Sequence, residues 1–248
     1  MGFSTWGFGP NETDKEETYQ FIELNADIYS EQIDDKIPWA AWMNNSTLPT
    51  EFTDEIDNRV SERLNNHKLV LSVSLLNTDR SDLLEDYDGT IPNYASLNDT
   101  NIENAYFKHL DFLIFKFNPD YLVIAMEVNE LKLHSGAKWT EYKLLMNNIR
   151  GKLKIAYPNL PLSESITLHN WFNPEVANPT DFIFEISNYV NQNYEFIIWW
   201  AYRDYDKLWE TFPPEYKDVG KLWRDTGLLD ENGTERPSLT TWKEILEK

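Results

Sequence analysis

The sequence contains no cysteine, which excludes disulfide bonds, thiolate metal sites and a cysteine nucleophile. Its four histidines, His67, His109, His134 and His169, do not have the spacing of a metal site. No apolar run approaches the ~18 residues that a membrane-spanning helix needs. No Gly-x-Gly-x-x-Gly or Walker sequence occurs, which counts against a nucleotide-binding doubly wound fold. We therefore expect a protein without a metal, a cofactor or a membrane span.

Basic residues are also scarce, with 22 against 42 acidic residues and a net charge of −20. This balance argues against nucleic acid and anionic membranes as partners, because both are polyanions. The 248 residues are 41% hydrophobic, enough for one sizeable core, so we expect a monomer with a single domain over residues 1–248. Residues Gly2–Trp6 are expected to form structure rather than a signal peptide. Secreted and cytoplasmic locations both remain open.

Predicted strands and helices alternate along the whole chain. The strands are expected at residues 3–8, 26–33, 68–76, 121–128, 160–168 and 195–201, and the helices at 11–24, 53–65, 101–117, 139–156, 179–192 and 238–248. This alternation predicts an α/β fold with a parallel sheet, and a TIM-type (β/α) barrel fits best. Only six strands are recognisable rather than eight. Either two strands lie in irregular segments, or the barrel is abbreviated between its fifth and last strands.

The segment 121–130 is the most informative part of the sequence. Its aliphatic run predicts a buried strand that ends in Glu127, Asn129 and Glu130. Burying a charge is costly unless the charge is paired or used. In a β/α barrel the active site lies at this end of the strands. We therefore predict a functional site at Asn129 and Glu130; for Glu127, an ion pair and a site role are equally open.

Asn129–Glu130 resembles the acid/base motif of the clan A glycoside hydrolases, which are retaining (β/α)8 enzymes. Further stretches resemble a galactanase-like branch of that clan; they are residues 2–6, 26–33, 75–80, 196–204 and 223–237. The resemblance runs nearly end to end, and only the Asn–Glu pair is specific to the chemistry. It implies a barrel that acts on carbohydrate, with Glu130 as the general acid/base. It also implies that Asn129 contacts the sugar next to the scissile bond.

A retaining glycosidase needs a second carboxylate, the nucleophile, about 5–5.5 Å from the acid/base. The resemblance implies a nucleophile at the end of strand seven, and Glu164 is the candidate within residues 160–169. The same segment also predicts the fifth strand, where no nucleophile belongs. In that case Glu164 is a solvated or ion-paired acid, so both interpretations stay open.

Ten tryptophans are available to stack on the apolar faces of sugar rings, although tryptophan is largely buried in any core. The candidates are Trp6 and either Trp199 or Trp200, since neighbouring strand residues face opposite sides. Polar candidates for binding sugar hydroxyls lie at other strand ends and have loop-capping as their alternative role; they are Glu31, Asn77 and His169. Arg203 and Asp204 are expected to pair with each other.

Two functions follow. The first is a retaining glycoside hydrolase that cleaves a β-linked polysaccharide or oligosaccharide, with Glu130 as acid/base. The alternative is a degenerate barrel that binds carbohydrate without cleaving it, because the strand-seven nucleophile is missing. The sequence does not specify the sugar, the linkage, or exo against endo action.

Overall fold

The computed structural model describes residues 1–166, 198–221 and 224–246. Contacts between backbone positions divide the chain into two compact units. Unit 1 comprises residues 1–32, 64–70 and 194–248, and unit 2 comprises residues 33–63 and 71–193. The expectation of a single domain over residues 1–248 stays a prediction.

The described strands form one six-stranded sheet in the order β5-β4-β3-β2-β1-β6. The strands are β1 (Gly2–Ser4), β2 (Ile28–Ile33), β3 (Lys68–Val73), β4 (Tyr121–Val123), β5 (Leu162–Ser163) and β6 (Ile198–Trp199). Within unit 1, β1 pairs in parallel with β2 and β6, and within unit 2, β4 pairs in parallel with β5. This confirms the predicted α/β class with a parallel sheet. All six predicted strands have a counterpart; β1 to β5 are shorter than expected, and β6 ends at Trp199 instead of residue 201.

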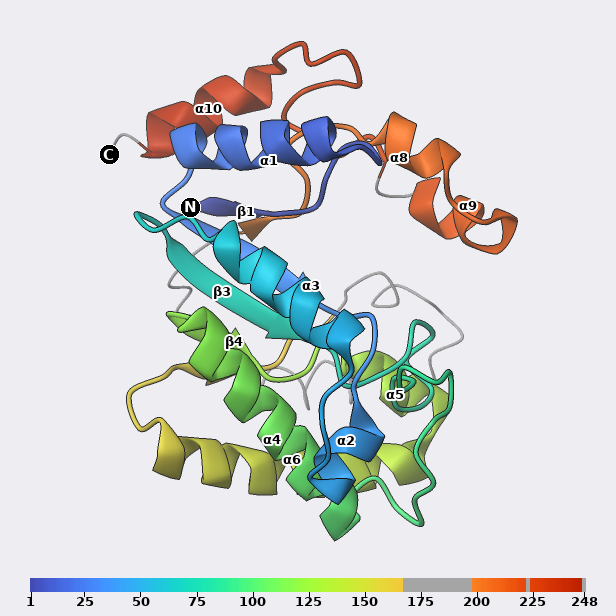
Figure 1. Ribbon diagram of the computed structural model, residues 1–248. Coiled ribbons are helices and arrows are strands. Elements are labelled where there is room, and N and C mark those ends of the chain that lie inside the picture. The colour runs from blue at the N-terminus through green and yellow to red at the C-terminus, as the bar shows by residue number, and fades with distance from the viewer. Residues whose placement is uncertain (167–197, 222–223, 247–248) are drawn as a thin grey trace. The chain divides into compact units, whose positions relative to one another are not determined.

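Helices follow the strands along the chain (Figure 1). They are α1 (Glu12–Asn25), α2 (Trp39–Asn44), α3 (Thr50–Ser61), α4 (Thr100–Phe117), α5 (Asn129–His134), α6 (Gly136–Ala156), α8 (Asp206–Glu210), α9 (Pro214–Lys221) and α10 (Pro237–Leu246). Five predicted helices match α1, α3, α4, α6 and α10. The short helices α2, α5, α8 and α9 were not predicted, and the helix predicted at 179–192 lies outside the described residues.

Unit 1 packs its first and last helices, α1 and α10, against β1. The ring of Phe3 is fully buried, 5.4 Å from the ring of Phe21 on α1 and 4.5 Å from that of Trp242 on α10. Helix α1 begins at a capping box in which the Asn11 backbone N–H donates to the Asp14 carboxylate at 3.1 Å. The aromatic contacts thus hold the first and last helices on the same strand.

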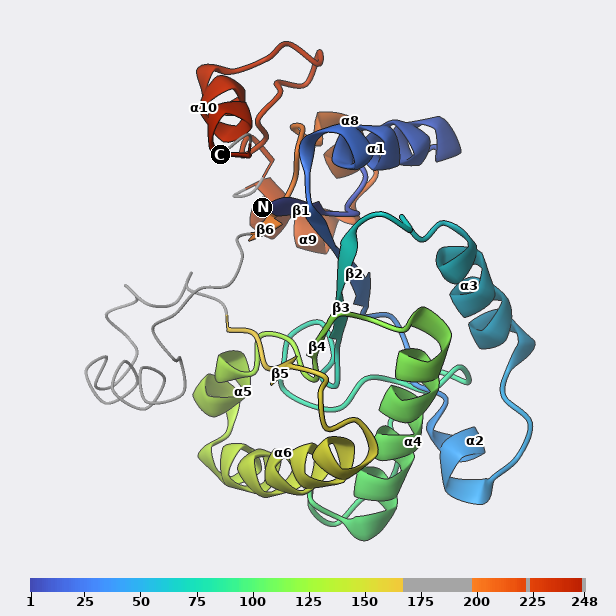
Figure 2. The same cartoon turned by 90° about the vertical axis from the view of Figure 1, so that its left-hand side faces the viewer.

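Unit 2 is built around α4, whose buried residues recur every three to four positions and face the core. The helix begins at Asp99, whose side chain accepts from the Asn101 N–H at 2.8 Å, and ends at Asn118 in the left-handed conformation. Helix α2 lies beside α4 (Figures 1 and 2). Its N-terminus is capped by Asp86, whose carboxylate accepts from the Ala40 N–H at 2.7 Å.

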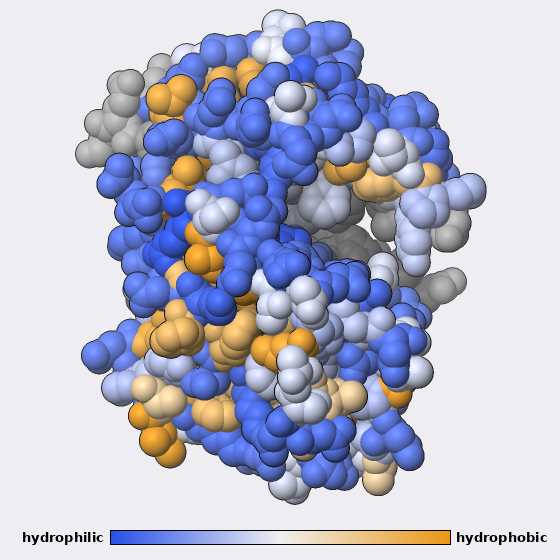
Figure 3. All heavy atoms as spheres, viewed as in Figure 1, coloured by the Kyte–Doolittle hydropathy of each residue, from blue (hydrophilic) through white to orange (hydrophobic). Residues whose placement is uncertain are grey.

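No helix in the described part of the chain is long and apolar enough to cross a bilayer. Hydrophilic residues cover most of the face seen in Figure 3. This surface agrees with the large excess of acidic over basic residues in the sequence.

His109 of α4 is fully buried in an aromatic cluster. Its ring centroid lies 5.6 Å from that of Phe52 and 6.2 Å from that of Tyr106. The Trp42 Nε1–H donates to His109 Nδ1 at 3.3 Å, and His109 Nε2 has no hydrogen-bond partner in the described chain. Burial without a nearby acid lowers the pKa of His109 to about 3, so the ring is neutral in the folded protein.

Stability should therefore fall as the pH decreases from about 6.5, the ordinary histidine pKa, toward 3. In this window the unfolded chain binds a proton at His109 that the folded chain does not bind. The loss in free energy of unfolding approaches about 1.4 kcal/mol per pH unit. Urea unfolding of wild type and His109→Gln at pH 7, 6 and 5 should give the steeper pH dependence for wild type. His134→Gln, at an exposed histidine, is the control; equal slopes for all three proteins would contradict the expectation.

Candidate active site

Asn129 and Glu130, the predicted acid/base motif, are the first two residues of α5 in unit 2. Both side chains are buried, with exposed fractions of 1% and 8%. The Asn129 Nδ2 group donates to Glu130 Oε1 at 3.4 Å. The structure thus brings the amide and the carboxylate together, close to the C-terminal end of β4, as the sequence indicates.

The chain leaves the sheet earlier than predicted, because β4 ends at Val123 instead of Val128. Glu127 has a φ of +51°, in the left-handed region that non-glycine residues rarely adopt. Ser165, beyond β5, holds this turn: the Glu127 N–H donates to Ser165 Oγ at 2.9 Å and the Val128 N–H to Ser165 O at 3.1 Å. A sharp turn, rather than a continuous strand, therefore presents Glu130.

Glu127 forms an ion pair, which is one of the two roles left open by the sequence. Arg80 donates to Glu127 Oε2 from Nε at 3.0 Å and from Nη2 at 2.6 Å. Arg80 also lies in the left-handed region, with φ at +59°. This pair connects the segment after β3 with the turn after β4, and sequence reasoning did not identify Arg80 as its partner.

Asn77 caps the loop that contains Arg80. Its Oδ1 accepts from the backbone N–H groups of Ser81 at 3.0 Å and Asp82 at 3.1 Å. Its backbone carbonyl accepts from Arg80 Nη1 at 2.9 Å. This is the loop-capping role that the sequence left as an alternative, and a contact of Asn77 with sugar stays a prediction.

Glu164, the candidate nucleophile, directs its carboxylate at helix α6. Oε1 accepts from Arg150 Nη2 at 2.6 Å and Nε at 3.0 Å, and Oε2 accepts from the Tyr142 hydroxyl at 2.8 Å. The Glu164 side chain is 12% exposed. Burial, followed by the charge of Glu164, raises the pKa of Tyr142 above its ordinary value, so this hydroxyl stays a donor. These contacts are those of the ion-paired strand acid.

Among the unit 1 candidates, Trp6 and Trp200 lie together, with ring centroids 5.1 Å apart. Trp199 is 40% exposed, and its Nε1–H donates to Thr226 O at 2.9 Å. Trp200 rather than Trp199 is thus the partner of Trp6. Glu31 is buried and accepts from the Tyr19 hydroxyl at 3.0 Å. The remaining candidate, His169, lies outside the described residues.

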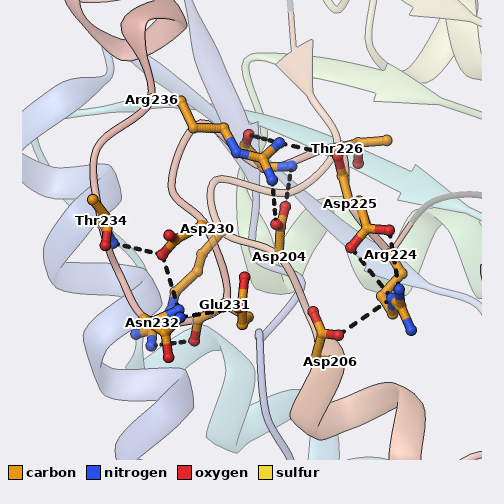
Figure 4. Close-up of polar contacts among 12 residues, drawn as sticks. Asp204, Asp206, Arg224, Asp225, Thr226, Asp230, Glu231, Asn232, Thr234 and Arg236 are labelled. Atoms are coloured by element: carbon orange, nitrogen blue, oxygen red, sulfur yellow. Dashed lines mark hydrogen bonds and ion pairs between the residues drawn. The ribbon is translucent and has the colours of Figure 1, made fainter.

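A group of three acids follows β6 in unit 1 (Figure 4). Carboxylate oxygens of Asp204, Asp206 and Asp225 lie within 4.8 Å of one another. Arg236 pairs with Asp204 at 2.5 Å, while Arg224 pairs with Asp206 at 3.3 Å and with Asp225 at 3.1 Å. The two arginines offset most of the charge of the three acids, so the group is an ion-pair network.

The expected pair between Arg203 and Asp204 is wrong, because neighbouring side chains point to different sides of an extended chain. Arg203 instead lies over the Phe8 ring at 4.0 Å. Asp204 is 2% exposed and accepts from the Gly227 N–H at 2.9 Å in addition to Arg236. Burial raises the pKa of Asp204, and the Gly227 and Arg236 contacts oppose this effect.

Replacing Arg236 by Met should destabilise unit 1 by about 2–3 kcal/mol, because the buried Asp204 carboxylate loses its counter-charge. Urea unfolding monitored by tryptophan fluorescence measures the loss. Arg224→Met removes an arginine of the same network whose acid partners, Asp206 and Asp225, are much more exposed than Asp204, so it should cost clearly less. Equal losses for both variants would argue against a special role for the buried pair.

Among known proteins, the chain resembles solved structures only in its fold. No protein-family model and no curated protein sequence matches the chain. Among solved structures, a GH5_18 glycoside hydrolase from Bifidobacterium longum subsp. infantis superposes with a TM-score of 0.62 and 12% identity, covering 99% of this chain and 77% of that one. A Glu-to-Ala variant of GH5_18 from B. longum subsp. longum, in complex with Manβ1-4GlcNAc, gives a TM-score of 0.60 and 11% identity, covering 96% and 73%.

These structures confirm the resemblance to clan A glycoside hydrolases at the level of the fold. They also confirm a TIM-type α/β architecture with six recognisable strands in the described part of the chain. Neither neighbour is named a galactanase, so the galactanase-like branch stays a prediction. The chain therefore shares its fold with the GH5 glycoside hydrolases over nearly its whole length.

Proposed function

We propose that this protein is a glycoside hydrolase that acts on a β-linked oligosaccharide or polysaccharide. One observation carries the proposal: a buried Asn–Glu pair follows the fourth strand of a fold shared with GH5 enzymes. A buried carboxylic acid at the C-terminal end of a barrel strand suits proton transfer to a leaving group.

Two observations support carbohydrate as the ligand. One structural neighbour carries Manβ1-4GlcNAc, a β-linked disaccharide. In this chain, the adjacent rings of Trp6 and Trp200 form the kind of aromatic surface that packs on sugar C–H faces. We propose these two rings as a sugar platform, and Glu31, Asn77 and His169 as further candidates for polar contacts with hydroxyl groups.

In the proposed mechanism, a carboxylate attacks the anomeric carbon while Glu130 protonates the departing glycosidic oxygen. Water then attacks the glycosyl-enzyme, and Glu130 takes its proton, which restores the starting state with retained configuration. Asn129 contacts the sugar next to the scissile bond. The retaining course and these roles are part of the proposal.

Replacing Glu130 by Gln removes the transferable proton and keeps the size of the side chain. Turnover of an unactivated β-linked disaccharide such as Manβ1-4GlcNAc should fall at least about 10³-fold. An aryl β-glycoside with a good leaving group should lose less in its first step, because that leaving group needs little protonation. The measurement is steady-state release of sugar and of the aryl group.

Glu103→Gln serves as the matched control for that experiment, since Glu103 pairs with Lys152 on the outer helices α4 and α6. It should keep wild-type rates. Unchanged turnover in Glu130→Gln would remove Glu130 from the chemistry. Binding of β-linked oligosaccharides by calorimetry, with no sugar release by wild type over long incubation, would favour the alternative of a non-catalytic carbohydrate-binding barrel.

Glu164 is open to a direct test between its two roles. As an ion-paired strand acid, it joins β5 to α6 through Arg150 and Tyr142. On the contacts described above we favour this role, so Glu164→Gln should lower stability by about 2–3 kcal/mol and keep most of kcat. Thermal unfolding and steady-state kinetics measure both. A loss of kcat above about 10³-fold in folded protein would instead identify Glu164 as the nucleophile.

A further inference from the structure

Glu127 stands three residues before Glu130 and adopts a backbone conformation that its side chain does not favour. A non-glycine residue in the left-handed region costs about 1–2 kcal/mol, and glutamate is not among the residues that visit it readily. Such a conformation persists only where surrounding contacts enforce it. The contacts of Glu127 therefore decide how the turn after β4 is built.

The side-chain contact comes from Arg80, which is itself held firmly. Its Nη1 group donates to Ser74 Oγ, Leu76 O and Asn77 O at 3.3, 3.1 and 2.9 Å. Its Nε and Nη2 groups both donate to one oxygen of Glu127. The Arg80 side chain is 13% exposed and that of Glu127 is 40% exposed, so the pair is shielded from solvent mainly on the arginine side. The guanidinium group is thus fixed to the segment that follows β3.

A short chain of contacts leads from Arg80 to the proposed acid/base. Arg80 fixes the Glu127 side chain, and the Glu127 backbone carbonyl accepts from the Glu130 N–H at 3.2 Å. Ser165 binds the same turn from the β5 side. Helix α5 begins at Asn129, two residues after Glu127, so the position of Glu130 follows from the conformation of Glu127.

We propose that Arg80 is a positioning residue for Glu130, acting through the left-handed turn at Glu127. Its catalytic consequence rests on the proposed glycosidase function. An acid/base that is displaced by about 1 Å loses on the order of 10²-fold in rate, so Arg80 should affect catalysis without touching substrate.

The first arm of the test measures the turn without any substrate. Hydrogen exchange of the Glu130 amide, followed by NMR, should accelerate at least tenfold in Arg80→Gln relative to wild type. The control is Arg59→Gln, which breaks the Arg59–Glu55 pair on α3 in the same unit. The control should leave exchange at Glu130 within twofold of wild type.

The second variant tests the reason for the effect. Glycine adopts positive φ without a steric cost, so Glu127→Gly removes the need for the clamp at that position. In the double variant Arg80→Gln/Glu127→Gly, exchange at Glu130 should be at least threefold slower than in Arg80→Gln, and thus closer to the wild-type rate. A role of Arg80 in general stability alone predicts no such rescue.

The kinetic arm uses an aryl β-glycoside and a β-linked disaccharide. Arg80→Gln should lower kcat for the disaccharide about 10–100-fold with KM within threefold, and the double variant should recover part of kcat. Unchanged exchange at Glu130 in Arg80→Gln overturns the proposal, whatever the rates. If exchange at Glu130 accelerates in Arg80→Gln but kcat stays at the wild-type value, the proposed effect of Arg80 on catalysis is overturned.

These outcomes separate the two proposals. If wild type cleaves no glycoside, the glycosidase function fails, and the exchange arm still decides whether Arg80 sets the position of Glu130. If wild type is active and Glu130→Gln is inactive, the function stands, and the Arg80 variants alone decide the positioning role.

Discussion

The turn that follows β4 is the constraint on which the candidate site depends. Its backbone takes a left-handed step at Glu127, which the residue does not favour on its own. Side chains from two neighbouring segments hold it there, Arg80 after β3 and Ser165 after β5. Asn129 and Glu130, both buried, begin helix α5 directly after this turn. Parallel strands that end at one edge of the sheet make this cross-bracing available.

Elements with a clear helical period could be predicted from the sequence. Helix α4 matches its predicted range to one residue, because its apolar spacing, its cap and the following Pro119 agree. Helix α2 was missed, since its cap comes from Asp86, which lies 46 residues further along the chain than Ala40. The fourth strand was likewise predicted too long because its end depends on a contact with a residue far away in the sequence. Its aliphatic run continues past Val123, and the ion pair that shapes the turn joins residues 47 positions apart.

The site shows the same division. Asn129 and Glu130 could be located because a buried strand that ends in an amide and an acid is a local pattern. The partners of Glu164 could not, since Arg150 and Tyr142 belong to the preceding helix and only packing brings them to β5. Alternation along the last strand predicts that one of its two tryptophans faces the site. The structure shows that Trp200, rather than Trp199, contacts the Trp6 ring, and a place for either ring in the site stays a prediction.

The last helix has a consequence for how the chain can be shortened. Trp242 of α10 packs on the buried ring of Phe3 at the opposite end of the sequence, and Arg236, just before α10, neutralises the buried Asp204. A protein truncated ahead of residue 236 would expose β1 and would leave the buried Asp204 carboxylate of unit 1 without the charge of Arg236. Residues 236–246 therefore contribute to the folded core of that unit, and deletion studies of this protein should treat β1 and α10 as one structural piece.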